Sequence, residues 1–264
     1  MADSLAAMTI LVTRSAGQLS QFSELLRSAG AQVMEMPALE IRAPSTWQPL
    51  DAAISQLSTF DWLILTSANA VRYFCDRLAV VGRLQDLQSL QLAVVGKKTA
   101  AIAQQYGLTP TFTPPDFVAD ALVTHFPEPV AGRKLLFPRV VSGGREVLVQ
   151  AMTAAGAVVA EVPAYESGCP AIACPEAISA LQSGQIQIIT FASSKTVRHT
   201  GRLLQQAFGE TWLQVLETVA IASIGPKTSA TCQDLLGRVD IEAEEYTLEG
   251  LTEAITQWAS ALSD

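Results

Sequence analysis

The sequence predicts an α/β protein made of two similar, doubly wound parallel-sheet units. Its 264 residues are 49% hydrophobic and 16% charged, which supports a large buried core. Short apolar runs alternate with stretches of helical spacing, as in βαβ units and parallel sheets. The apolar runs are nearly continuous, which indicates sheets covered on both faces. The third observation is an internal repeat of about half the chain.

The repeat can be followed residue by residue. Segment 30–40, Gly-Ala-Gln-Val-Met-Glu-Met-Pro-Ala-Leu-Glu, returns at 156–166 as Gly-Ala-Val-Val-Ala-Glu-Val-Pro-Ala-Tyr-Glu, with seven of eleven positions identical. Further along, Ser67 matches Ser193. A period of this length exceeds the ~20–50 residues of solenoid repeats. We therefore expect two copies of one domain-sized unit that face a shared site.

Each copy predicts the same order of elements. β-Branched and apolar runs predict strands, and amphipathic stretches between turn residues predict helices; Gly30, for example, marks a helix end. In the first copy we expect strands at 9–13, 33–40, 62–65 and 92–95, and helices at 19–29, 50–57, 98–106 and 119–126, with a further helix that follows the strand at 62–65 through segment 67–71. In the second copy we expect strands at 135–137, 158–165, 187–191 and 219–224, and helices at 145–155, 175–181, 194–207, 227–236 and 248–262.

Composition argues against several classes of protein. The net charge of −8 does not suit nucleic acid, because phosphate contacts need a basic face. The four cysteines lack CxxC spacing and only two histidines are present, so no metal site is expected. Neither a P-loop nor a GxGxxG motif occurs, so no cofactor is expected. No apolar run reaches the ~20 residues of a membrane span, and the N-terminus lacks a basic start, so we expect a cytoplasmic protein.

Polar segments follow the predicted strands at equivalent places in the two copies. Segments 66–69 and 192–195 follow one strand, and segments 96–99 and 225–228 follow another. In parallel sheets, ligands collect at the carboxyl ends of strands, and helix N-termini there bind anions. Serine and threonine also cap helices, so capping alone stays an alternative for each segment. Together with the scarcity of acid–base groups, the pattern favours a large polyanionic substrate that is steered more than activated.

Four segments resemble the uroporphyrinogen-III synthase family: 65–71 (Leu-Thr-Ser-Ala-Asn-Ala-Val), 94–100 (Val-Val-Gly-Lys-Lys-Thr-Ala), 221–229 (Ile-Ala-Ser-Ile-Gly-Pro-Lys-Thr-Ser) and 246–251 (Tyr-Thr-Leu-Glu-Gly-Leu). The resemblance runs from Ile10 to Ile255. It implies two flavodoxin-like lobes joined by a two-strand linker. Lobe one is then 1–40 plus 167–264, and lobe two is 43–164. The repeat alone would place a single boundary near residue 130.

The resemblance also implies an activity. The family substrate is hydroxymethylbilane, a linear tetrapyrrole with four acetates and four propionates. A lyase of this family removes water, inverts ring D and closes the macrocycle to uroporphyrinogen III, in the pathway to heme. Without the enzyme, closure gives the type I isomer, so catalysis is mainly positioning. A cofactor-free monomer is expected, with transient contacts to neighbouring enzymes of the pathway. The alternatives are a non-catalytic tetrapyrrole or anion sensor and a bilobal binding protein of the periplasmic type, which the lack of an export signal disfavours.

The resemblance places a tyrosine beside the cleft at Tyr165, where a phenol can protonate the departing hydroxyl. Packing between the lobes is the alternative for this ring. Thr228 matches a family threonine and is expected to bind a carboxylate. The other expected substrate-binding residues are Thr13, Arg14, Ser67, Asn69, Gly96, Lys98, Thr99, Arg139, Ser193, Ser194, Gly225 and Lys227. For these, helix caps or solvated surface charges are the alternatives.

Overall fold

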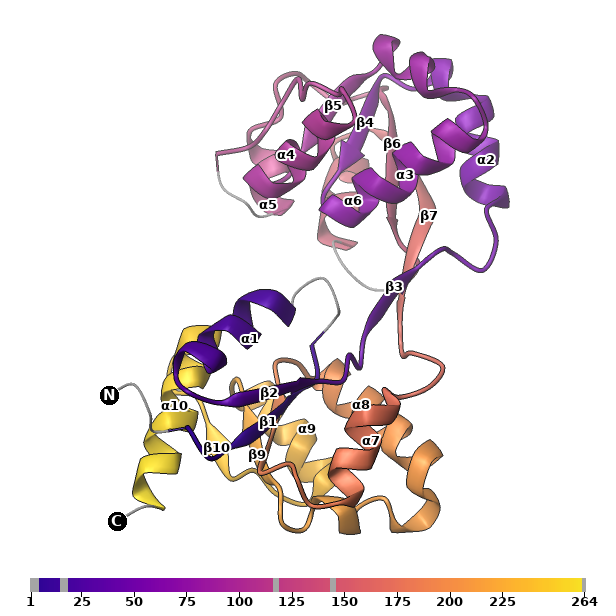
Figure 1. Cartoon of the computed structure of the whole chain (residues 1–264). Coiled ribbons are helices and arrows are strands. Elements are labelled where there is room, and N and C mark those ends of the chain that lie inside the picture. The colour runs from indigo at the N-terminus through magenta and orange to yellow at the C-terminus, as the bar shows by residue number, and fades with distance from the viewer. Residues whose placement is uncertain (1–4, 15–18, 116–118, 143–145, 263–264) are drawn as a thin grey trace. The chain divides into compact units, whose positions relative to one another are not determined.

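The chain forms two compact units in the computed structural model, which describes residues 5–14, 19–115, 119–142 and 146–262. Unit 1 consists of Met1–Glu40 and Gly168–Asp264, and unit 2 consists of Ile41–Ser167. Each unit is built on one five-stranded sheet (Figure 1). The expected lobe limits lie within a few residues of these unit limits. In the described part of the chain, no helix combines the length and apolarity needed to span a membrane.

Unit 1 contains a parallel sheet with strand order β2-β1-β8-β9-β10. Its strands are β1 (Thr9–Val12), β2 (Gln32–Glu35), β8 (Ile188–Phe191), β9 (Ala220–Ser223) and β10 (Ile241–Glu242). Its helices are α1 (Leu19–Ser28), α7 (Pro175–Gln182), α8 (Ser194–Phe208), α9 (Pro226–Leu236) and α10 (Leu248–Ala261), with short 3₁₀ turns η4 (Gly209–Thr211) and η5 (Gln214–Leu216).

Unit 2 contains a sheet with strand order β3-β7-β6-β4-β5. Its strands are β3 (Glu40–Arg42), β4 (Trp62–Leu65), β5 (Gln91–Val94), β6 (Lys134–Val140) and β7 (Val158–Gly168). Its helices are α2 (Gln48–Ser55), α3 (Ala68–Val80), α4 (Lys97–Gln105), α5 (Ala119–Thr124) and α6 (Glu146–Ala154), with 3₁₀ helices η2 (Leu57–Thr59) and η3 (Leu84–Ser89).

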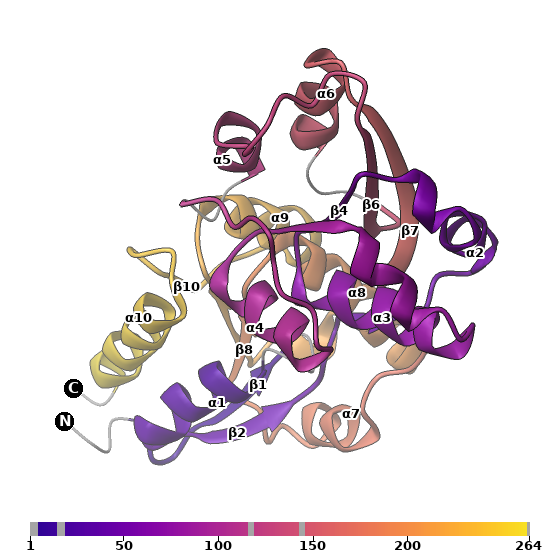
Figure 2. The same ribbon diagram turned by 90° about the horizontal axis from the view of Figure 1, so that it is seen from above.

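Helices cover both faces of each sheet. Successive strand residues point to opposite faces, so neighbouring residues of one strand contact different helices. In unit 1, Ile10 packs in a core with α1 and α10, whereas the next residue, Leu11, packs with α7, α8 and α9. In unit 2, Ile64 packs with α5 and α6, and Leu65 packs with α2, α3 and α4. Figure 2 shows α5 beside α6 and α3 beside α4. The predicted doubly wound α/β class is therefore confirmed.

The repeat is visible in the strand register. In unit 1, Ile188 of β8 pairs with Ile10 on one side and Ala220 on the other. In unit 2, its repeat partner Trp62 pairs with Leu135 and Gln91, which are the repeat partners of Ile10 and Ala220. Even the two-residue β10, where Ile241 lies opposite Ala222, has a counterpart in the bridge from Phe112 to Ala93. Each sheet therefore combines the first β-α-β segment of one copy with the remainder of the other.

The predicted strand at 33–40 is wrong in one respect. The structure has two strands there, β2 ending at Glu35 and β3 beginning at Glu40, whereas the equivalent β7 continues through Pro163 to Gly168. The partner strands explain the difference. β1 ends at Val12, but β6 extends to Val140 and accommodates Pro163 with a register shift. β10 and the 3₁₀ helices were not predicted, because such short elements leave little periodicity in a sequence.

Candidate functional site

Two serines begin the helices that follow β4 and β8. Ser67 Oγ accepts a hydrogen bond from the Ala70 amide at 3.0 Å, and Ser193 Oγ accepts one from the Thr196 amide at 3.2 Å. Both serines are therefore N-caps, and both remain only half-buried. Asn69 lies in the first turn of α3 and is also half-buried. Each cap stands at the carboxyl end of a central strand, where the sequence predicted a ligand site.

Gly96 and Gly225 begin α4 and α9, and neither helix has a side-chain cap. Gly96 has a φ of 91°, a conformation that favours glycine. Both copies then place lysines outward and a threonine inward: Lys98 and Lys227 are exposed, whereas Thr99 and Thr228 are buried. An anion at the start of α4 would meet backbone N–H groups, the positive end of the helix dipole and an ammonium group. At the start of α9, Pro226 has no N–H and the Thr228 and Ser229 amides donate to the Gly225 carbonyl oxygen, so an anion there would meet mainly the helix dipole and the Lys227 ammonium group.

In unit 1 the two polar segments meet. Ser194 Oγ donates a hydrogen bond to the Lys227 carbonyl oxygen at 2.8 Å, which ties the start of α8 to the start of α9. In unit 2 the helices α3 and α4 are also neighbours, but Ala68 replaces the serine and offers no hydroxyl. The structure thus brings together the predicted residues Ser193, Ser194 and the 225–228 segment at one edge of unit 1.

Thr13 and Arg14 follow β1 at the same edge of unit 1. Thr13 is fully buried, and its hydroxyl donates to the Thr190 carbonyl oxygen at 2.7 Å. The Thr190 hydroxyl in turn donates to the Leu11 carbonyl oxygen at 3.2 Å, so these threonines tie β1 to β8. Burial lowers the pKa of the Arg14 guanidinium, which remains protonated at neutral pH. Thr13 therefore supports the sheet, and Arg14 places a positive charge at this strand end.

Arg139 is the repeat partner of Arg14 and has a different environment. It forms an ion pair with Glu161 of the neighbouring strand, and its guanidinium carbon lies 5.9 Å from the centroid of the Phe137 ring. The Arg139 side chain is 14% exposed. With Glu146 and Pro163, the pair lines a cavity of about 270 Å³. A substrate carboxylate at this place would share Arg139 with Glu161.

Tyr165 lies on β7, 9% exposed, within the core of unit 2. Its hydroxyl is 3.1 Å from Ser67 Oγ, and either group can donate the hydrogen bond. Its ring stacks on that of Tyr73, with centroids 5.8 Å apart and planes inclined by 23°. Two residues that the sequence proposed separately, Ser67 and Tyr165, thus meet at the end of β4. Here a hydrogen bond holds the phenol oxygen beside Ser67, and the Tyr73 ring packs against the phenol ring.

Three polar residues near these positions were not predicted as site residues: Tyr73, Glu161 and His199. The Tyr73 hydroxyl donates to the Ile41 carbonyl oxygen at 3.0 Å, and His199 Nδ1 donates to that of Ala38 at 2.7 Å. Burial lowers the pKa of His199. The repeat contained a signal, because Tyr73 and His199 are equivalent positions that both carry polar rings. Glu161 is likewise equivalent to Glu35.

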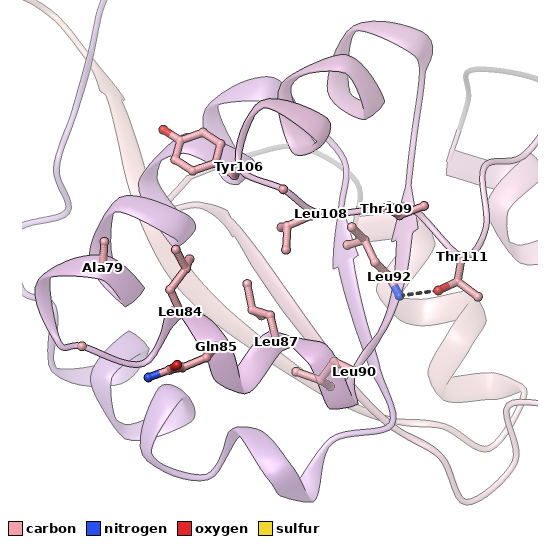
Figure 3. A pocket seen from close by; sticks show the side chains of 12 residues that line it. Ala79, Leu84, Gln85, Leu87, Leu90, Leu92, Tyr106, Leu108, Thr109 and Thr111 are labelled. Atoms are coloured by element: carbon pink, nitrogen blue, oxygen red, sulfur yellow. Dashed lines mark hydrogen bonds between the residues drawn. The ribbon is translucent and has the colours of Figure 1, made fainter.

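A cavity of about 830 Å³ lies elsewhere in unit 2 (Figure 3). Its wall combines leucines, among them Leu87 and Leu92, with uncharged polar residues such as Tyr106 and Thr111, and its described lining residues include no lysine or arginine. The cavity opens near the start of β5, whereas Gly96 follows the end of that strand. Burial and a hydrogen bond to Asp76 raise the pKa of Tyr106 to about 12, so this phenol stays protonated. The cavity therefore does not fit a polyanion.

The fold and the site define a two-lobe α/β protein whose sheets each carry helix starts suited to anions. Residues 20–253 match the family model described as uroporphyrinogen-III synthase HemD, and the chain belongs to this family of enzymes. It is 53% identical to the uroporphyrinogen-III synthase of Synechococcus elongatus over 97% of both chains. It is 29% identical to a putative uroporphyrinogen-III synthase of Methanothermobacter thermautotrophicus, over 92% of this chain and 96% of that one.

Solved structures support the fold. A uroporphyrinogen-III synthetase from Helicobacter pylori matches with a TM-score of 0.58 at 19% identity, over 97% of this chain and 99% of that one. A mutant uroporphyrinogen III synthase from Thermus thermophilus matches with a TM-score of 0.56 at 16% identity, over 97% of this chain and 100% of the other. The two-lobe α/β expectation is thus confirmed, and nothing in these matches favours a non-catalytic sensor.

Proposed function

We propose that this chain is a cyclising hydro-lyase that converts hydroxymethylbilane to uroporphyrinogen III with inversion of ring D. Family membership over nearly the whole chain supports this reaction, as does the relative from Synechococcus elongatus that carries the enzyme's name. The observation that carries the chemical proposal is the position of Tyr165, whose hydroxyl lies 3.1 Å from Ser67 Oγ at the end of a central strand. That position suits a proton donor.

In the proposed reaction, the Tyr165 hydroxyl gives its proton to the substrate hydroxyl as the C–O bond breaks and water leaves. The electron-rich pyrrole supplies the electrons, and the product of this step is a protonated azafulvene, an azafulvenium cation. Ring D then attacks through its substituted carbon to form a spiro intermediate, which fragments and recloses with the ring inverted. Rearomatisation releases one proton, which returns to the Tyr165 oxygen. The net change is the loss of one water molecule.

Positioning is the larger part of the proposed catalysis, because the bilane closes to the type I isomer without help. Holding reactive groups in one geometry removes most of the entropic barrier to a chosen path. We propose that Lys98, Lys227, Arg14 and Arg139, with the amides that begin α4, bind the substrate carboxylates. The hydroxyls of Ser193, Ser194, Thr99 and Thr228 and the amide of Asn69 are proposed to assist. A protein of net charge −8 needs such local positive potential to bind a polyanion.

The proposal extends to the state of the protein. We propose that the enzyme works as a cytoplasmic monomer without cofactor or metal, with the two units acting as lobes. In the described residues, no group of three or more histidine, cysteine, aspartate or glutamate side chains is arranged to hold a metal ion. Activity after exhaustive dialysis against a chelator tests this part directly. Turnover is expected to be unchanged, and a loss that a metal ion restores would contradict it.

The reaction itself is tested with purified protein and hydroxymethylbilane. The products are oxidised to porphyrins, and the type I and type III isomers are separated by chromatography. Type III product is expected to predominate and to increase with enzyme concentration. Formation of type I alone, at the rate seen without protein, would overturn the proposal.

A further inference from the structure

Two residues of helix α3 contact the Tyr165 side chain, one at its hydroxyl and one at its ring. Ser67, the N-cap of α3, contacts the Tyr165 hydroxyl, and Tyr73, farther along the same helix, stacks on its ring. A hydrogen bond between two hydroxyl groups fixes a distance but leaves each group free to rotate. The stacked ring adds the constraint that the hydrogen bond lacks, because it restricts the plane of the phenol.

Tyr73 is itself held in place. Its hydroxyl donates to the Ile41 carbonyl oxygen on β3, and β3 is the neighbour of β7, the strand that carries Tyr165. Tyr73 therefore joins α3, β3 and β7. If its ring rotated away from Tyr165, the bond to Ile41 would break. The hydrogen bond to β3 thus holds the Tyr73 ring in place, and the Tyr73 ring in turn restrains the Tyr165 ring.

Ordinary core packing does not account for Tyr73. The adjacent Phe74 is fully buried and fills the core of unit 2, whereas Tyr73 is only partly buried against that core. In the other copy, the residue equivalent to Tyr73 has a hydrogen bond to the backbone but no tyrosine ring to stack on. There, His199 Nδ1 donates to the carbonyl oxygen of Ala38, whose repeat partner is Ala164 rather than Ile41, and the residue equivalent to Tyr165 is Leu39. A polar ring at this place is thus tied to the backbone in both units, although to different segments, and the stacked pair of phenols occurs where Tyr165 is.

We propose that Tyr73 is a positioning residue that holds the Tyr165 hydroxyl in one orientation for proton transfer. This inference rests on the proposed role of Tyr165 as proton donor. Tyr73 acts through Tyr165 and does not touch the reacting atoms. Removing its ring should therefore slow the chemical step only while Tyr165 has a hydroxyl to orient.

The test is a double-mutant cycle on kcat. Tyr73→Leu should lower kcat about tenfold in the wild-type background, a part of the ~10²–10⁴-fold typical of general acid catalysis. In the Tyr165→Phe background the same substitution should lower kcat less than about twofold, because no donor remains to be oriented. Tyr73→Phe keeps the stacked ring and should retain more activity than Tyr73→Leu. KM should change little in each case.

Tyr106→Phe is the matched control, since it removes from the same unit a phenol hydroxyl that lines the other cavity and bonds to Asp76 rather than to Tyr165. It should leave kcat unchanged. If Tyr73→Leu does not fold, Tyr73→His, which introduces the residue of the other copy, replaces it in the cycle. Equal losses in both Tyr165 backgrounds would show a structural role for Tyr73 and overturn the inference alone. Wild-type turnover by Tyr165→Phe would overturn the proposed role of Tyr165 and the inference with it.

Discussion

The two units share a framework and differ in the residues that it carries. Both sheets have the same strand register, and the equivalent strands β4 and β8 are each followed by a serine N-cap. At equivalent places, however, unit 2 has Tyr165 and Tyr73 where unit 1 has Leu39 and His199. Duplication has therefore preserved the helix starts that suit carboxylates, whereas the phenol that suits proton transfer belongs to unit 2. The comparison predicts that equivalent substitutions in the two units will have unequal effects.

The two N-cap serines should show the largest difference. Ser67→Ala removes both the cap of α3 and the hydrogen bond to Tyr165, whereas Ser193→Ala removes the cap of α8. Each should cost about 1 kcal/mol of stability as a lost cap. Ser67→Ala should in addition lower kcat about tenfold more than Ser193→Ala does. Steady-state kinetics and urea unfolding measure both effects, and equal kcat values would contradict the assignment of Ser67.

Cationic residues should affect binding more than turnover. Lys227→Gln removes an exposed ammonium group at the start of α9 and should raise KM about 3–10-fold, which lies within the range of about 0.5–1.5 kcal/mol for one typical hydrogen bond. Arg139→Gln should raise KM further, because it leaves Glu161 without its cation in the same cavity.

Adding Glu161→Gln to Arg139→Gln separates these effects, since it removes the repelling carboxylate. The double variant should recover part of the lost affinity. Wild-type KM in both single variants would identify Arg139 and Lys227 as surface charges without a role in binding.

His199 should give unit 1 a modest sensitivity to acid. Burial lowers its pKa in the folded protein below the ordinary value of 6.5, with Lys195 and Arg202 contributing and the bond to Ala38 opposing. Above pH 6.5 the ring is neutral in both states. As the pH falls below 6.5, the unfolded chain binds the proton first, so stability is lost until the pH passes the lowered pKa. Urea midpoints between pH 5 and 8 should fall less steeply for His199→Gln than for wild type, and parallel curves would contradict this.

The sequence predicted the fold class, the equivalence of the two copies and most positions at the strand ends, because each depends on local pattern or on the repeat. It did not predict how those residues pair. The Ser67–Tyr165 contact joins residues from different copies, and the Arg139–Glu161 pair joins neighbouring strands. Such contacts depend on sheet order and register. The break in the strand near Pro37 escaped prediction for a similar reason, because it depends on the length of the partner strand β1.

We propose that unit 2 alone supplies the group that handles the proton, and turnover by two variants tests this role most directly. Tyr165→Phe keeps the ring and removes the donor, and His199→Gln removes the polar ring at the Tyr73-equivalent place in unit 1. At pH 8, with isomers separated, Tyr165→Phe should turn over about 10²-fold more slowly while still making type III product. His199→Gln should retain kcat within about twofold. Wild-type turnover by Tyr165→Phe, or a large loss of kcat in His199→Gln, would contradict the account.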